Sequence, residues 1–211
     1  MRKLILSIMT IVLSIPAMAQ SYMTTEDYKK EYLYYYGLRL GMNLSTVSSD
    51  DSYLDGGDIQ AGLNIGALVG FQLSPQAPVY LESGLFYSEK GGKGKNQGKK
   101  FIYNLNYLEV PVVIKYKFDV DGDFSVHPFA GGYMAWGIGG RIKNYGDRET
   151  YKTFCEDNFK RFDGGIRLGC GFEYQILYGE MAYDLGIANL GHDDFGSSKN
   201  GCFTINFGVN F

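Results

Sequence analysis

The stretch that decides the fold is Tyr107–Phe118, "YLEVPVVIKYKF". Its apolar residues alternate with a second set that includes Glu109, Lys115 and Lys117. Because successive side chains of a β-strand point to opposite faces, this period of two predicts a strand with one apolar face and one polar face. The fold then depends on which face meets the surroundings and which is enclosed.

Seven other segments alternate in the same way, at residues 36–44, 62–73, 79–87, 127–140, 163–174, 177–187 and 202–211. The composition agrees, with 18 Tyr, 14 Phe and 29 Gly, because aromatic residues favour strands and glycines favour the turns between them. Eight strands are an even number, so an up-and-down antiparallel barrel can close with no exposed edge.

The two faces differ in size as well as polarity. Large aromatic residues crowd the apolar face, whereas Gly, Ala and Asn accompany the charges on the other. The interior of an eight-stranded barrel has room only for side chains that fill it. We therefore expect the apolar face to meet lipid and the polar face to line the lumen, as in all-β transmembrane barrels. The predicted lumen charge network is Arg39, Glu82, Glu109, Lys115, Lys117, Arg167, Glu173, Glu180 and Asp184.

The connections between these segments alternate in length. Those after the second, fourth and sixth segments are short, at residues 74–78, 119–123 and 175–176, and the other four are long. Short periplasmic turns and long extracellular loops are typical of bacterial outer-membrane barrels. The pattern places both ends of the barrel chain on the periplasmic side.

The first 19 residues have the pattern of a secretory signal peptide: Arg2 and Lys3, then an apolar run, then small residues at Ala17 and Ala19. We expect cleavage before Gln20. Residues 20–35 form a periplasmic lead and residues 36–211 form the barrel. The predicted location is the outer membrane of a Gram-negative bacterium.

Two of the expected loops carry opposite charge. The first holds Asp50, Asp51, Asp55 and Asp58, and the second is a basic surface loop with Lys90, Lys93, Lys95, Lys99 and Lys100. The basic loop could bind anionic lipid headgroups or a surface polysaccharide; alternatively, the two loops attract each other or only remain solvated. The net charge of −3 gives no basic excess of the kind that a nucleic-acid partner requires.

No catalytic, metal or cofactor site is expected. The two histidines, His127 and His192, fall at opposite ends of the barrel, and the Gly-rich stretches lack the spacing of phosphate or dinucleotide loops. Of the three cysteines, Cys170 should face lipid and Cys202 the lumen, so a Cys155–Cys202 disulfide at the outer rim is a hypothesis.

Three stretches resemble the PorT-like outer-membrane β-barrel family of Gram-negative bacteria: "YLEVPVVIKYKF", "HPFAGGYMAWGIGG" and "FDGGIRLGCGFEYQILYGEMAYDLGIANL". The resemblance implies the same barrel fold and no shared catalytic residues. It also suggests a role, because some PorT-like proteins are accessory components of protein secretion across the outer membrane. The terminal Phe211 resembles the aromatic end that the barrel assembly machinery reads.

Three functions are consistent with these features. The first is a closed, non-enzymatic barrel that presents surface loops for binding, adhesion or envelope structure. The second is an accessory role beside secretion-system proteins, and the third is a narrow pore for small solutes. Opposite charges inside so small a barrel should pair and fill it, which favours the closed barrel.

Overall fold

The computed structural model describes residues 34–49, 56–74, 76–96, 99–144, 149–154, 159–190 and 198–211. The predicted signal peptide and most of the predicted lead lie outside these residues. None of the described residues forms a helix long and apolar enough to cross a membrane.

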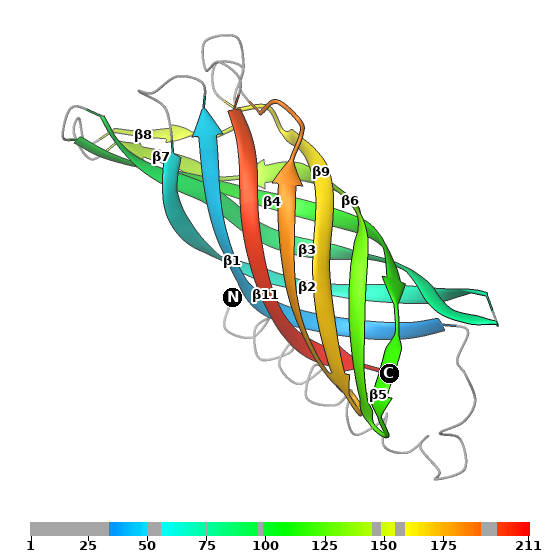
Figure 1. The fold of residues 1–211 in the computed structure, drawn as a ribbon. Helices are drawn as coiled ribbons and strands as arrows, with labels where there is room; N and C mark the ends of the chain where they lie inside the picture. Colours follow the sequence, from blue (N-terminus) through cyan, green and yellow to red (C-terminus); the bar gives the residue numbers. More distant parts are fainter. Residues whose placement is uncertain are drawn as a thin grey trace, which may run out of the picture.

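The described chain is all β (Figure 1). Its strands are β1 (Tyr34–Ser49), β2 (Gly56–Ser74), β3 (Ala77–Asn96), β4 (Lys99–Tyr116), β5 (Phe118–Asp121), β6 (Phe124–Gly139), β7 (Arg141–Asn144), β8 (Glu149–Lys152), β9 (Phe162–Tyr174), β10 (Leu177–Gly186) and β11 (Ser198–Asn210).

These segments form a closed, eight-stranded antiparallel barrel, as the sequence predicts. Each of β1 to β4 pairs with the next, β4 pairs with β6, and β6 pairs with β9. The ring closes through β9, β10 and β11, because β11 pairs with β1 from Gly37↔Asn210 to Ser49↔Ser198. The short strands β5 and β7 continue β4 and β6, and β8 pairs with β7.

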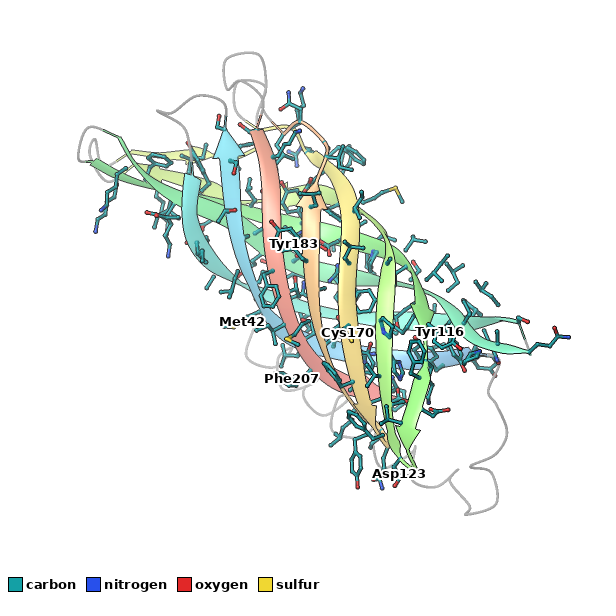
Figure 2. All side chains as sticks on the ribbon, viewed as in Figure 1. Met42, Tyr116, Asp123, Cys170, Tyr183 and Phe207 are labelled. Carbon is teal, nitrogen blue, oxygen red and sulfur yellow. The ribbon has the colours of Figure 1, made fainter. Side chains whose placement is uncertain are left out.

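The predicted direction of the two faces is confirmed along the deciding stretch. Glu109 and Lys115 are buried, whereas Leu108, Val112 and Ile114 are exposed. The same division holds around the ring, and Phe207 on β11 has 68% of its surface exposed. Figure 2 shows Met42, Tyr183 and Phe207 on this outer face. Large apolar side chains with no protein cover need a non-aqueous surrounding, which a lipid bilayer supplies.

Three connections are as short as expected and define one end, here called the lower rim. They join Ser74 to Ala77, Asp121 to Phe124 and Tyr174 to Leu177. Gly122 has a φ of 48°, a left-handed conformation that glycine adopts without steric penalty. Both the beginning of β1 and the end of β11 lie at this rim (Figure 1).

The opposite end, the upper rim, differs from the prediction. The expected long loop between the third and fourth strands is a hairpin, because β3 continues to Asn96 and β4 begins at Lys99. The first expected loop is likewise reduced to residues 50–55. With 20 residues, β3 is about 65 Å long at ~3.3 Å per residue, well beyond an apolar band ~25 Å tall even when the strand is tilted. The β3–β4 hairpin therefore projects past the membrane.

Candidate functional site: the barrel interior and its upper rim

Four charged residues meet near the middle of the barrel and are called the charge square: Lys90 on β3, Glu109 on β4, Arg167 on β9 and Asp184 on β10. Glu109 Oε2 lies 2.7 Å from Lys90 Nζ, and Glu109 Oε1 accepts from Arg167 Nη1 at 2.6 Å. Asp184 lies 3.0 Å from Lys90 Nζ and 3.5 Å from Arg167 Nε. Two cations and two carboxylates are thus neutralised within one enclosed layer.

A second group lies below the square, towards the lower rim. Lys115 Nζ lies 2.5 Å from Glu82 Oε2 and donates to Tyr178 Oη at 2.8 Å. Glu82 also accepts from Tyr35 Oη. The guanidinium of Arg39 stacks 3.9 Å from the Tyr178 ring, an arrangement that the ring quadrupole favours.

The lowest charges lie at the rim itself. Lys117 Nζ donates to Glu173 at 3.0 Å, and Asn210 Nδ2 donates to the other oxygen of the same carboxylate. Asn210 Oδ1 in turn accepts from Arg39 Nη2 at 2.6 Å. The Lys117–Glu173 pair is partly solvated, since the Lys117 side chain is 32% exposed.

Neutral polar residues form further hydrogen bonds inside the barrel. Asn206 Nδ2 donates to Glu180 at 2.9 Å. On the neighbouring strand β1, Asn43 accepts from Thr204 Oγ1 at 2.8 Å and donates to Ser88 Oγ at 2.9 Å. Because buried polar groups are costly when they lack partners, such a network stabilises the interior only when its members bond one another.

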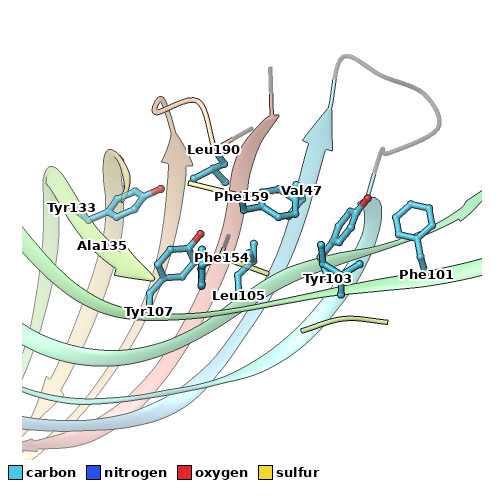
Figure 3. Close-up of a cluster of buried hydrophobic side chains, with 11 residues drawn as sticks. Val47, Phe101, Tyr103, Leu105, Tyr107, Tyr133, Ala135, Phe154, Phe159 and Leu190 are labelled. Atoms are coloured by element: carbon cyan, nitrogen blue, oxygen red, sulfur yellow. The ribbon is translucent and has the colours of Figure 1, made fainter. Parts of the chain in front are cut away.

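Above the charge square a cluster of apolar side chains is buried in the interior (Figure 3), and Tyr133 of this cluster donates to the buried Asp163 at 3.4 Å. The residues of this cluster, here called the aromatic plug, are all buried: Val47, Phe101, Tyr103, Leu105, Tyr107, Tyr133, Ala135, Ile142, Phe154, Phe159 and Leu190. The rings contact edge to face, with the Tyr103 and Phe159 centroids 5.2 Å apart and those of Tyr107 and Phe154 5.5 Å apart. Phe154 and Phe159 lie between β8 and β9, so side chains from outside the strands help to fill the interior.

All nine residues of the predicted lumen network lie on the interior face, and the structure brings them into the groups described above. The sequence reasoning missed Tyr35 and Tyr178, the buried Asp163 that accepts from Asn200 at 2.8 Å, and the aromatic plug. Strand parity contains the signal for part of the plug, because Phe101, Tyr103, Leu105 and Tyr107 share the parity of Glu109.

The assignment of Lys90 to a basic surface loop is wrong. Lys90 is 2% exposed and belongs to the charge square. The reason is that β3 continues through this position, and Lys90 shares the inward parity of Glu82 and Ser88. Lys93, Lys95 and Lys100 do lie on the outer face of the projecting hairpin, whereas the side chain of Lys99 lies outside the described part.

The proposed Cys155–Cys202 disulfide is also wrong, because Cys202 is a free thiol. It is fully buried in the interior, 3.7 Å from Thr204 Oγ1, and so is enclosed below the rim. Cys170 is free and partly exposed on the outer face, as expected.

His127 is buried at the lower rim, with its Nε2 2.8 Å from Ser125 Oγ. Several residues of the sequence predictions lie outside the described residues: Cys155, His192, Asp50, Asp51 and Asp55. Phe211 lies at the lower rim, where its backbone pairs with Tyr36.

A closed antiparallel barrel with an apolar outer face and an ionic interior defines a transmembrane β-barrel. The chain belongs to the family described as outer membrane protein beta-barrel domain, whose model matches residues 18–191. This family places it in the outer membrane of Gram-negative bacteria.

Solved outer-membrane proteins are similar in structure. Ail, the attachment invasion locus protein of Yersinia pestis, is 13% identical with a TM-score of 0.44, and the match covers 84% of this chain and 98% of Ail. OprG from Pseudomonas aeruginosa is 11% identical with a TM-score of 0.44, covering 84% and 95% of the two chains. Neisserial surface protein A is 14% identical with a TM-score of 0.41, covering 84% and 97%. No curated protein matches this chain in sequence.

Proposed function

We propose that the protein is a closed, non-enzymatic outer-membrane barrel whose role is to hold its upper rim, with the β3–β4 hairpin, at the cell surface for binding or envelope structure. The observation that carries this proposal is the filled interior. The charge square and the aromatic plug lie one above the other along β4, and Lys90, Glu109, Tyr107 and Leu105 are all almost completely buried.

This packing argues against the narrow pore. A hydrated ion that crossed the barrel would have to separate Glu109 from both Lys90 and Arg167, then displace the aromatic rings above them. Breaking a buried ion pair leaves uncompensated charge and is strongly unfavourable. Through-going conduction is therefore not expected from the folded barrel.

Planar-bilayer recording tests the proposal. The folded protein should give no unitary conductance steps at high salt. As a control, a variant with Lys90, Glu109, Arg167, Asp184 and Phe159 all changed to Ala removes matched charges together with part of the plug and should conduct. Regular steps from the unmodified protein, confirmed as folded by its altered gel mobility before boiling, would contradict the proposal.

The PorT-like assignment remains a proposal that rests on the three resembling stretches. It leads to the accessory role in protein secretion, for which a strain lacking this gene should lose secreted proteins from its medium. A deletion strain with unchanged secretion would remove that role and leave the closed barrel as proposed.

A further inference from the structure

The projecting hairpin and β7 carry five cations on one outer surface, here called the basic patch: Lys93, Lys95, Lys100, Arg141 and Lys143. All are exposed except Lys93, which is half-buried. The strand register places Lys93 opposite Ile102 and Ile102 opposite Lys143, so two lysines flank one isoleucine. Lys95 lies directly opposite Lys100. Directly opposed side chains lie about 5 Å apart at Cβ, so these cations form one continuous surface.

Few neutralising groups lie beside the patch among the side chains that the structure describes. No carboxylate with a described side chain forms an ion pair with any of the five cations. Asp58 lies opposite Lys93 at the edge of the patch, while Glu89 accepts from Tyr87 Oη at 2.9 Å and from the Leu63 amide at 3.1 Å. Since like charges placed directly opposite each other destabilise a strand pair, an external anion would stabilise the hairpin.

The patch begins where the lipid-facing surface ends. A row of outward residues crosses four strands through the pairs Tyr87↔Leu108, Leu108↔Trp136 and Trp136↔Phe162. Aromatic residues of this kind mark the boundary between hydrocarbon and headgroups in outer-membrane barrels. Arg141 follows Trp136 by five residues, or about 16 Å along the strand and roughly 12 Å in height at a 45° tilt. Long basic side chains can reach back towards that boundary.

We propose that the basic patch binds the phosphate groups of phosphorylated glycolipid headgroups in the outer leaflet. This inference rests on the proposed function only in requiring that the upper rim faces outwards. Lysine ammonium groups neutralise phosphate as point charges, and the Arg141 guanidinium can bind two phosphate oxygens at once. A lipid fits better than a soluble anion, because its acyl chains would lie against the apolar surface around Trp136 and Ile138 just below.

Native mass spectrometry of the folded protein in zwitterionic detergent tests this proposal, with diphosphoryl lipid A, monophosphoryl lipid A and phosphatidylethanolamine as probes. The unmodified protein should retain the diphosphorylated lipid best and phosphatidylethanolamine least. Changing Lys93→Gln together with Lys143→Gln should weaken retention of diphosphoryl lipid A by roughly 30-fold if each cation contributes as basic residues near anionic headgroups do.

The matched control is Lys160→Gln with Lys199→Gln, which removes two cations from the upper half of the barrel outside the patch and should change retention less than twofold. All variants are compared as folded protein by their gel mobility before boiling.

Equal retention of the two lipid A forms, or equal loss in the two double variants, would overturn the proposal. So would complete competition by millimolar inorganic phosphate, which would make the site one for free anions, or displacement by a sulfated polysaccharide that binds without lipid. This measurement does not depend on conductance. The lipid-binding proposal can therefore fail while the closed barrel stands, and the closed barrel can fail while lipid binding stands.

Discussion

The lower and upper halves of the barrel interior are filled by opposite kinds of chemistry. Below, opposite charges pair in layers around Lys115 and Glu109; above, rings such as Phe159 and Tyr107 pack edge to face. Both fillings exclude water, but they respond differently to change. An ion-paired layer depends on every partner being present, whereas an apolar layer loses stability in proportion to the volume removed. The comparison shows that one barrel can be filled by two chemically different layers, which meet where Lys90 Nζ lies 4.2 Å from the Tyr133 ring centroid.

The sharpest way to break the comparison is to remove one carboxylate from the charge square. Glu109→Gln leaves Lys90 and Arg167 facing Asp184 alone, and the free energy of unfolding should fall by about 3–5 kcal/mol, the range for breaking a buried pair. Urea unfolding followed by the fluorescence of Trp136, the single tryptophan, measures this change.

The matched control is Glu89→Gln on the outer face of the neighbouring strand β3. Among the described residues its carboxylate bonds to Tyr87 and a backbone amide alone, so the loss should stay near 1 kcal/mol, as for an ordinary hydrogen bond. Equal losses at the two positions would show that the buried carboxylate of the charge square stabilises the barrel no more than a carboxylate on the outer face does.

A smaller loss is expected from the aromatic plug. Phe159→Ala removes a ring that is 2% exposed and should cost about 3 kcal/mol, at the lower end of the range for such cavities because the site lies near the rim. The control Phe207→Ala, on the lipid-facing surface, leaves no internal cavity and should cost about 1–2 kcal/mol. A larger loss at Phe207 than at Phe159 would mean that the plug is loosely packed. The charge square remains in the Phe159 variant, so it should still not conduct.

The smallest effect is expected at the lower rim. Lys117→Gln removes a pair with Glu173 that is already partly solvated, and exposed or partly exposed pairs contribute at most about 1 kcal/mol. The loss should shrink further in high salt, because salt screens solvated charges far more than enclosed ones. If the unfolding free energy instead falls as much as in Glu109→Gln, the gradient from solvated rim to dry interior does not exist.

The sequence predicted the barrel, because the period of two recurs in eight segments. It also predicted the direction of the faces, because an eight-stranded interior has no room for the large aromatic side chains of the apolar face. It did not predict the upper end. Lys90 stands in a stretch rich in Gly and Lys that is typical of a loop, yet backbone pairing with β4 keeps it in a strand. The alternation along a strand indicates on which face a side chain lies, but not which residue it contacts. The contacts of Lys90 with Glu109 and Asp184 depend on the stagger of strands that are distant in sequence. The inward fold of Phe154 and Phe159 depends on tertiary packing and leaves no periodic signal.

Cys202 offers the most direct measurement of closure, because its thiol is fully enclosed in the interior. In a protein with Cys155→Ser and Cys170→Ser, a small charged thiol reagent should leave Cys202 unmodified while the barrel is folded and modify it completely after denaturation. Modification of the folded protein at a rate near that of a free thiol would contradict a closed interior.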